Sequence, residues 1–527
     1  MLDTFIQYIL LVIAILLLVM LAQKLKIAYP IILVLGGLLL SIIPGIPAIS
    51  IDPELIFIIF LPPLLYEAAW YTSWKALWRW RRVISSFAFL IVIVTSLVVA
   101  LVSSSIIPGF TLALGFLLGG IVSPPDAVSA TSVLKFVKVP KRLTAIIEGE
   151  SLLNDASSLI VFRFALVAVD TGRFVFHEAA VSFIVVIAMG ILTGITIGLM
   201  YYGIHKWLPT TPNMDIVLSL TAPYVMYIAA ESLHFSGVLA VVSGGLFLSA
   251  KSHQFLSHRS RLRGSNVWST IGFVLNGLVF MLIGLQLPVI TKELGTVSLK
   301  DAILYGFIIT AVLIVTRIIS TLGSSLFTRF ISRYITTADS NPGWSGPLII
   351  GWAGMRGVVS LAAALSIPVY LSDGSAFPQR NLILFITFMV ILLTLVVQGL
   401  SLPLVIRWIN MKDPDELLPA EEQHLLIRRK LAEHSAKFLD EQHHEILKNN
   451  KAVQQLRAKL ETDQSPPDQA AGAEEEDYRR IYLRLLTKQR SFLHELNKKS
   501  EIDEDIIRKH HDLLDLEEEK FRVRFEG

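Results

Sequence analysis

Long runs of apolar residues, separated by short polar stretches, follow one another along the first 410 residues of the chain. A helix needs ~20 apolar residues to cross the ~30 Å hydrocarbon core of a bilayer. Judged against that length, the pattern predicts thirteen membrane spans. They cover about 2–23, 29–45, 52–72, 84–107, 111–136, 143–168, 178–203, 213–233, 236–250, 266–289, 300–327, 346–371 and 381–408. The second and ninth runs are short, which leaves twelve or fourteen spans open.

Residues 411–527 have a different character, because they are rich in Lys, Glu, Arg and Gln and contain no run long enough to span a bilayer. The chain is therefore predicted to have two domains, a transmembrane domain at 1–410 and a helical cytoplasmic tail at 411–527. An apolar stripe at seven-residue spacing predicts one long amphipathic helix at 420–463, suited to packing on a partner helix such as that of a second subunit. Its members are Leu425, Ala432, Leu439, Ile446, Val453 and Leu460.

The segment at 464–477, QSPPDQAAGAEEED, reads as a flexible break before a second helical region at about 478–525. We interpret the tail as regulatory or dimer-stabilising. The paired histidines His443-His444 and His510-His511 fit either a pH sensor or metal site, or ordinary solvated helix faces, and the sequence leaves this open.

The composition agrees with a polytopic membrane protein and narrows its chemistry. Hydrophobic residues make up 53% of the 527 residues and charged residues only 17%. With no cysteine, disulfides, thiolate metal sites and a catalytic thiol are excluded. The twelve histidines form no HExxH pattern and there is no phosphate-binding P-loop, so the sequence offers no support for an enzyme. The first apolar run lacks a basic n-region, which argues against a cleaved signal peptide.

Basic residues divide unevenly between alternate loops of this scheme. One set of loops holds Lys24, Lys26, Lys75, Arg79, Arg81, Arg82, Lys135, Lys138, Lys141, Arg142, Lys206, Lys251, Arg259, Arg261, Arg263, Arg329 and Arg333. The opposite loops hold only Arg173, Lys292, Lys300 and Arg380. Because basic loops stay in the cytoplasm, the N-terminus is predicted outside and the tail inside. A bacterial inner membrane fits the compact tail.

Two spans are interrupted near their middles. The fifth contains Pro124-Pro125, which cannot continue a helix, and the twelfth contains three glycines around Arg356 in GWAGMRG. If spans one to six and eight to thirteen are inverted repeats, these two spans hold corresponding positions. Paired interrupted helices at matching positions are the best sequence pointer to the binding site of a transporter, although Pro and Gly are also common in ordinary membrane helices.

Ionisable side chains are predicted at the bilayer midplane in three separate spans. Asp155 lies about twelve residues into the sixth span, ~18 Å deep at the helical rise, and Asp126 and Arg356 lie at similar depth in the interrupted spans. A charge at that depth costs at least ~2.5–3.5 kcal/mol on insertion scales, so a functional site is the default interpretation.

Helical spacing sorts the polar residues of the sixth span into two faces. Ser151 and Asp155 share one face and offer hydroxyl and carboxylate oxygens, which suit a hard cation such as Na⁺. Glu150 and Asn154 share the other face, for which Arg356 is the predicted partner because its planar fork meets a carboxylate and an amide together. Glu67, in the third span, is predicted either to supply an outer oxygen ligand or to snorkel.

Four segments, GESLLNDASS, SPPDAVSAT, GMRGVVSLAAAL and ESLHFSGVLAVVSGGL, resemble the matching segments of sodium/proton exchangers in the monovalent cation/proton antiporter family. The resemblance implies an all-α fold of thirteen spans in two inverted six-span repeats, with crossed broken helices and a homodimer. It places the ion-binding aspartate at Asp155, its partner at Asp126 and a hydroxyl ligand at Ser151. It also implies a structural ionic lock of Glu150, Asn154 and Arg356, and it matches the glutamate of span three to Glu67.

One position departs from some relatives, which carry a Thr immediately before the aspartate of the broken helix. This chain has Pro125 there, so that only its backbone carbonyl can serve as a ligand. The Asn154-Asp155 pair, in place of two aspartates, is typical of electroneutral members of the wider superfamily.

The function expected from these residues is secondary active antiport of Na⁺ against H⁺ by alternating access. Asp155 binds either ion but not both. If the protein reorients only when Asp155 is occupied, Na⁺ and H⁺ must exchange one for one. Exchange of K⁺ or Li⁺ by the same mechanism is the open alternative, while an ion channel or an organic-anion symporter fits the clustered acids less well. No cofactor and no nucleic-acid partner are expected.

Overall fold

The computed structural model describes residues 2–43, 53–173, 176–292, 294, 297–334, 339 and 342–411, and beyond them only 440, 458, 483, 514, 516–518, 520 and 521. The chain divides into two compact units, Met1–Asp415 and Glu416–Gly527. The predicted tail helices and the two histidine pairs thus lie almost entirely outside the described residues. The described part of the first unit is helical, apart from a single antiparallel bridge between Tyr370 and Ala376.

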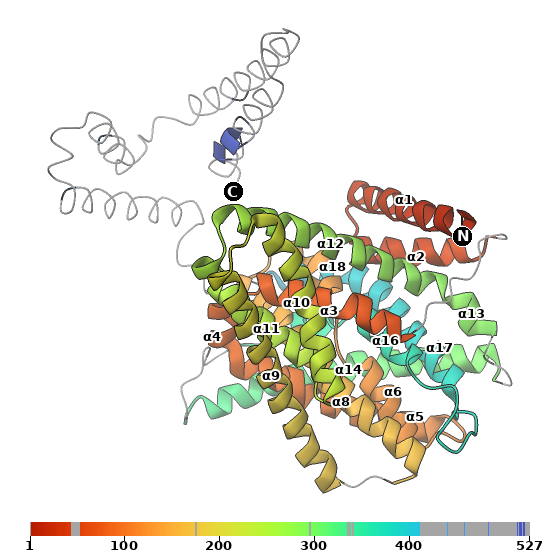
Figure 1. Cartoon of the computed structure of the whole chain (residues 1–527). Helices are drawn as coiled ribbons and strands as arrows, with labels where there is room; N and C mark the ends of the chain where they lie inside the picture. The colour runs from red at the N-terminus through yellow and green to blue at the C-terminus, as the bar shows by residue number, and fades with distance from the viewer. Residues whose placement is uncertain are drawn as a thin grey trace. The chain divides into compact units, whose positions relative to one another are not determined.

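The helices follow one another with short connections (Figure 1). The first half comprises α1 (Leu2–Leu25), α2 (Tyr29–Ser41), α3 (Pro53–Tyr71), α4 (Trp74–Ser85), the π-helical turn η1 (Ser86–Ile91), α5 (Val92–Ile106), α6 (Leu112–Val122), α7 (Ala127–Leu134), α8 (Lys141–Thr171) and α9 (Phe176–Trp207). The second half comprises α10 (Pro212–Ser232), α11 (Gly237–Phe255), α12 (His258–Leu285), α13 (Leu287–Lys292), α14 (Leu299–Ile331), α15 (Ser345–Trp352), α16 (Val358–Leu365), α17 (Arg380–Leu393), the π-helical turn η2 (Thr394–Gln398) and α18 (Gly399–Ile409).

A helix, or a row of shorter helices, occupies each of the thirteen predicted segments. By length and composition, seven helical stretches within the described residues are long and apolar enough to cross a membrane: Trp74–Ile106, Leu112–Leu134, Lys141–Thr171, Ala179–Trp207, Arg263–Lys292, Leu299–Ile331 and Arg380–Ile409. Three shorter apolar helices lie at Ile9–Leu25, Tyr29–Ser41 and Gly237–Ser252. Within the described residues the predicted all-helical architecture is therefore confirmed, whereas the exact span count stays a prediction.

Two helices begin well before the predicted spans, because arginine-rich segments that the sequence assigned to loops are helical. The fourth helical stretch begins at Trp74, where Ser73 caps it by accepting from the Ala76 amide at 3.3 Å, instead of at residue 84. Its first turns are amphipathic, since Trp80 and Ile84 are buried while the arginines around them are exposed. The tenth begins at His258 instead of residue 266.

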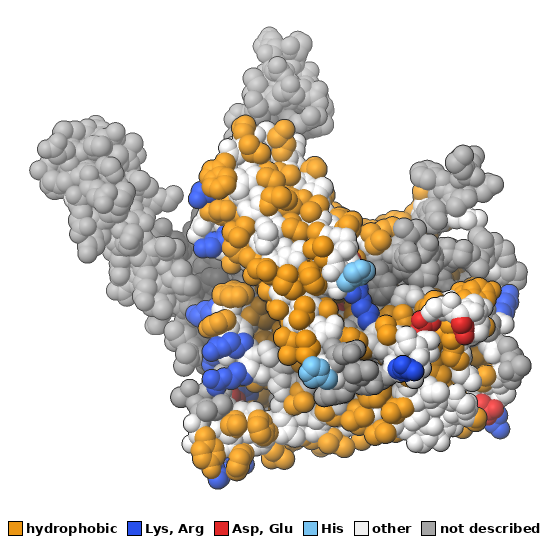
Figure 2. Space-filling model, turned by 60° about the horizontal axis from the view of Figure 1, so that its bottom comes forward, with side chains coloured by type: hydrophobic (Ala, Val, Ile, Leu, Met, Phe, Trp, Pro, Cys, Tyr) orange, Lys and Arg blue, Asp and Glu red, His pale blue; other side chains and the backbone are white. Residues whose placement is uncertain are grey.

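Close packing between neighbouring helices depends on small residues. At Gly115 and Gly119 of α6, a Cβ atom would come within 2.7 Å and 2.6 Å of the α5 backbone at Ala100 and Ser96. Small residues that let backbones approach are the usual interface of membrane helices. On the outside, large apolar side chains such as Leu17, Ile184 and Ile319 are 60%, 67% and 64% exposed, and Figure 2 shows apolar side chains spread over one face, as expected for contact with lipid.

Candidate functional site

The two predicted helix breaks are confirmed, and they meet. The α6 helix ends at Val122 and α7 begins at Ala127, while α15 ends at Trp352 and α16 begins at Val358. Between the breaks, the amide of Asp126 donates to the carbonyl of Met355 at 2.8 Å. Four half-helix ends therefore converge on one point, where backbone groups that lack helical partners face one another.

Asp126 holds the position predicted for it, at the start of the half-helix α7. Its carboxylate accepts from the amides of Val128 at 3.3 Å and Ser129 at 2.9 Å, and also from the Ser129 hydroxyl. An N-terminal carboxylate of this kind satisfies free amides and is favoured by the helix dipole. Across the gap, Gly357 lies so close that an added Cβ would stand 2.6 Å from the Asp126 Cγ.

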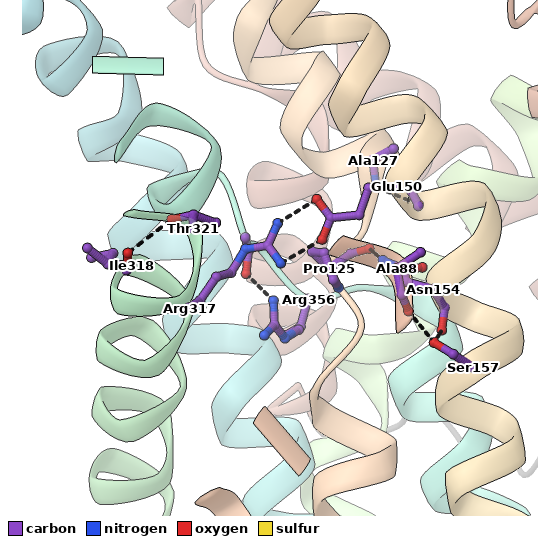
Figure 3. Close-up of polar contacts among 12 residues, drawn as sticks. Ala88, Pro125, Ala127, Glu150, Asn154, Ser157, Arg317, Ile318, Thr321 and Arg356 are labelled. Carbon is purple, nitrogen blue, oxygen red and sulfur yellow. Dashed lines mark hydrogen bonds and ion pairs between the residues drawn. The ribbon is translucent and has the colours of Figure 1, made fainter. Parts of the chain in front are cut away.

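The α8 helix passes directly beside this junction and carries the other predicted residues (Figure 3). The Ser151 hydroxyl accepts from the amide of Ala127 at 3.1 Å, and the Asn154 amide group donates to the Pro125 carbonyl at 3.0 Å. The Asn154 Oδ1 atom is buried and has no partner among the described residues. Ser151, Asn154 and Pro125 are thus brought together with Asp126 at one place.

Asp155 is 7% exposed, and no hydrogen bond to its carboxylate occurs among the described residues. Asp126 is its electrostatic neighbour. A buried carboxylate without a protein donor is costly unless a proton or a cation neutralises it. This feature distinguishes Asp155 from Asp126, whose oxygens are held by three donors.

The predicted ion pair between Glu150 and Arg356 is not what the structure contains. Both oxygens of Glu150 accept from Arg317 of α14, at 2.8 Å and 2.9 Å, in a bidentate pair (Figure 3). The Arg317 and Glu150 side chains are 4% and 1% exposed. Arg317 comes from the middle of an apolar helix that packs against α5 and α15, so that its guanidinium reaches Glu150 from the side.

Arg356 binds backbone carbonyls at the helix breaks and not the Glu150 carboxylate. Its guanidinium donates to the carbonyls of Val122, the last residue of α6, and Gly354, and its backbone amide donates to the Thr394 hydroxyl at 3.1 Å. Carbonyls at a helix C-terminus lack partners and carry negative partial charge, so that a cation is favoured there. The predicted three-residue lock of Glu150, Asn154 and Arg356 is therefore corrected: each of the three has a different partner.

Glu67 lies on α3, partly buried against α12, where an added Cβ on Gly272 would collide with its carboxylate. Tyr29, the first residue of α2, is an electrostatic neighbour of both Glu67 and Asp126. No hydrogen bond joins Glu67 to Asp155, and the role of Glu67 as an outer ligand stays a prediction.

Arg317 is the site residue that sequence reasoning missed, although the signal was present. It is the one charged residue in the apolar run at 302–328. The depth criterion that selected Arg356 would have selected Arg317 as well. Among the described residues, no cluster of three or more His, Cys, Asp and Glu is arranged to hold a metal. The oxygens at the junction suit a transported ion that is held by mixed carboxylate, hydroxyl and carbonyl groups.

Comparison with known proteins connects this geometry to a family. Residues 10–408 match the family model described as "Sodium/hydrogen exchanger, transmembrane". The chain belongs to this family. Among the curated exchangers, the chain is 33% identical over 518 residues to a "Sodium, potassium, lithium and rubidium/H(+) antiporter" of Bacillus pumilus, an alignment that covers 94% of this chain and 75% of the relative. It is also 33% identical to the "Low-affinity Na(+)/H(+) antiporter NhaS1" of Synechocystis, over 77% of this chain and 75% of the relative.

The fold of this exchanger is shared by a solved structure. The sodium proton antiporter MjNhaP1 from Methanocaldococcus jannaschii matches with a TM-score of 0.61 at 18% identity, over 78% of this chain and 100% of that chain. The predicted membership of a bacterial sodium/proton exchanger family is confirmed, and with it the interpretation of the chain as a transporter.

Proposed function

We propose that the chain is a secondary active antiporter that exchanges Na⁺ for H⁺ across the membrane by alternating access. One observation carries this proposal: Asp155 is a buried carboxylate with no hydrogen-bond partner among the described residues, and it lies on the helix that passes the junction of two broken helices. Broken helices whose ends meet inside a membrane protein are a typical construction for ion sites. The family supports the same function.

In this mechanism, Asp155 binds H⁺ and Na⁺ in competition. The empty, ionised carboxylate is expensive to carry through a low-dielectric region, and either ion reduces that cost. We assign as further Na⁺ ligands the Ser151 hydroxyl, the Asp126 carboxylate and the Pro125 carbonyl. The Pro125 carbonyl accepts one hydrogen bond from the Asn154 amide group and keeps a second lone pair for the cation. We propose that the Glu67 carboxylate supplies an outer oxygen ligand for Na⁺.

The neighbouring charges support electroneutral exchange. Glu150 and Arg317 neutralise each other, and Asn154 carries no charge, so Asp155 is the group that alternates between proton and Na⁺. One such group gives one-for-one exchange. Three donors hold the Asp126 carboxylate, and in this scheme it remains a fixed ligand throughout the cycle. Glu150, Asn154, Arg317 and Arg356 then act as the structural support of the junction.

We propose for the whole molecule thirteen spans in two inverted six-span repeats, with the N-terminus outside and the tail in the cytoplasm of a bacterial cell. The helices found at all thirteen predicted segments and the sorting of basic residues between alternate loops support this topology. A homodimer, with residues 411–527 as a regulatory or dimer-stabilising domain, completes the proposal.

Exchange of K⁺ or Li⁺ is the second candidate. The relative from Bacillus pumilus is named for sodium, potassium, lithium and rubidium, which favours a site of broad cation preference. Carboxylate, hydroxyl and carbonyl oxygens bind all of these hard cations, and their selectivity depends on cavity size and rigidity.

The decisive test uses proteoliposomes with an acidic interior. Na⁺, K⁺ or Li⁺ is added outside in turn, and an internal pH dye follows alkalinisation. The native chain is compared with Asp155→Asn and with Asp170→Asn, a matched control at the exposed end of the same helix. Na⁺-dependent alkalinisation that persists in Asp170→Asn, is lost in Asp155→Asn and is unaffected by collapse of the membrane potential is the expected result.

Native-rate exchange by Asp155→Asn would refute the proposed site. A response to K⁺ alone would keep the mechanism and change the substrate. Dependence of the rate on membrane potential would show that a second group, Asp126 first, also exchanges protons during the cycle.

A further inference from the structure

A buried oxygen atom without a partner lies on α12, a helix that carries none of the residues of the helix junction. Asn276 is 7% exposed, and its Nδ2 group donates to the Gly272 carbonyl, one turn earlier, at 2.8 Å. Because a carbonyl can only accept, this bond fixes which way the side-chain amide is turned and leaves the Oδ1 atom on its other side. No donor to Oδ1 occurs among the described residues. A buried acceptor of this kind is costly unless a ligand satisfies it.

The Glu67 carboxylate of α3 lies over the same turn of α12. An added Cβ on Gly272 would overlap both oxygens of Glu67, so a glycine is needed to leave room for the carboxylate against this helix. No hydrogen bond to the Glu67 carboxylate occurs among the described residues, and its electrostatic neighbour of opposite charge is Lys135, which is exposed directly after α7. The Glu67 carboxylate and the Asn276 amide therefore meet at one glycine.

The ring of Tyr29, the first residue of α2, lies on the other side of Asn276. Its centre is 6.4 Å from the ring centres of both Phe273 and Phe280 of α12. At ~100° per residue, Asn276 lies ~40° round the helix from Gly272 and ~40° from Phe280. Asn276 is therefore positioned between the turn that Glu67 covers and the face that Tyr29 covers.

This part of α12 adjoins the ion junction. Tyr29 is an electrostatic neighbour of both Glu67 and Asp126. The α12 helix packs against α2, α3 and α16, and α16 is the half-helix that begins at the second break (Figure 1). Glu67 and Asn276 thus lie next to the junction, on two helices that do not carry its broken segments.

From this arrangement we propose that the Asn276 Oδ1 atom is a further ligand of the transported cation and forms, with the Glu67 carboxylate, an outer site beside the junction. A carboxylate and an amide oxygen are hard donors, which suit Na⁺, K⁺ and Li⁺. A bound cation gives the Asn276 oxygen the partner that it lacks in the protein, and the bond from Nδ2 to Gly272 holds this oxygen in place. The inference rests on the proposed cation exchange and adds a residue to its ion path.

The test measures binding of radioactive Na⁺ to the purified full-length chain by scintillation proximity, together with exchange in the proteoliposome assay. Asn276→Leu removes the oxygen and the Nδ2 donor at similar volume, whereas Asn276→Asp keeps oxygen and removes only the donor. A residue needed merely for its bond to Gly272 is damaged by both changes, but a cation ligand is damaged by Leu alone. Asn266→Leu is the matched control, because Asn266 is exposed on the same helix.

We expect Asn276→Leu to raise the half-saturating Na⁺ concentration about tenfold, in binding and in exchange, with little change of the maximal rate, since loss of a group that supports a metal ion typically weakens binding by this factor or more. Asn276→Asp and Asn266→Leu should keep the native value or lower it. Equal losses in Asn276→Leu and Asn276→Asp would overturn the inference and show a structural role. A changed pH dependence of exchange with native Na⁺ binding would also overturn it and assign the oxygen to a protonated Glu67.

Failure of the outer site and failure of the proposed function give different results. A native chain that exchanges Na⁺, with an Asn276→Leu variant whose half-saturating Na⁺ concentration is also native, would overturn the outer site alone and leave Asp155 as the exchanging group. A native chain that neither binds nor exchanges Na⁺, K⁺ or Li⁺ would overturn the proposed function and the outer site with it.

Discussion

The bidentate pair between Glu150 and Arg317 predicts an unequal response to the loss of either partner. Both side chains are almost fully buried, at 1% and 4% exposure. Removing one member of such a pair typically costs about 3–5 kcal/mol of folding free energy, because an uncompensated charge is left in a low-dielectric interior. The neighbourhood of the pair decides which loss is worse.

Arg356 is that neighbour, buried to 1% exposure and electrostatically coupled to both members. Glu150→Gln leaves two buried guanidinium groups without a counter-charge, so we expect a loss near 5 kcal/mol. Arg317→Met leaves Glu150 beside Arg356, and we expect a loss near 3 kcal/mol. The double variant Glu150→Gln/Arg317→Met removes both charges and should lose much less than the sum of the single losses.

The assay is the free energy of unfolding in mixed detergent micelles, followed by circular dichroism as the denaturing detergent is increased. Arg163→Met is the control on the same helix. Arg163 pairs with Glu231, but the two side chains are 44% and 27% exposed, so the expected loss is within about 1 kcal/mol. Losses of less than about 1 kcal/mol in both Glu150→Gln and Arg317→Met would refute the reasoning, as would a double variant whose loss equals the sum.

Three further predictions concern the junction. Gly357→Ala should reduce Na⁺-dependent exchange at least tenfold in the proteoliposome assay, because the new Cβ would stand 2.6 Å from the Asp126 Cγ, whereas Gly323→Ala, with nothing within 4 Å, should be tolerated. Thr394→Val should lower the free energy of unfolding by ~1–3 kcal/mol, because the buried Arg356 backbone amide loses its acceptor. Thr394→Ser keeps a hydroxyl and should retain the native stability. An unchanged stability in Thr394→Val would contradict the role of the Thr394 hydroxyl. Asp126→Asn should raise the Na⁺ concentration needed for half-maximal exchange, since a neutral ligand attracts the cation less, and an unchanged value would remove Asp126 from the ligand set.

Much of the fold followed from the sequence, because membrane helices have a strong length and composition signal. The two breaks were predictable as well, from Pro124-Pro125 and from the glycines around Arg356, since backbone geometry forbids or weakens a helix there. The start of α4 was not predicted. A segment in which arginines alternate with tryptophans looks like a polar loop unless its amphipathic helical spacing is tested.

The residues of the site could be predicted from the sequence, but their ion-pair and hydrogen-bond partners could be predicted less well. Spacing on one helix correctly placed Ser151, Asn154 and Asp155 along α8, because α-helical geometry is local. The partner of Glu150 depends on how α14 packs against the rest of the bundle, which is a long-range property. Two buried arginines, Arg317 and Arg356, were possible partners of the Glu150 carboxylate. The sequence alone does not show the helix packing that pairs it with Arg317.

The π-helical turns η1 and η2 make two of the long helical stretches sensitive to the deletion of a residue. In η1 the Ala88 carbonyl accepts from the Ser157 hydroxyl of α8, and in η2 the Thr394 hydroxyl accepts from the Arg356 amide. A π turn amounts to one residue inserted into an α-helix. Deleting one residue from 394–398 would convert the wide turn into an ordinary helical turn and leave α17 and α18 in nearly the same rotational register, because five residues of a π turn and four residues of an α-helix each make slightly more than one turn. These segments should therefore accept many replacements of side chains, while the loss of one residue would close the wide turn and move the Ala88 carbonyl or the Thr394 hydroxyl away from its present partner.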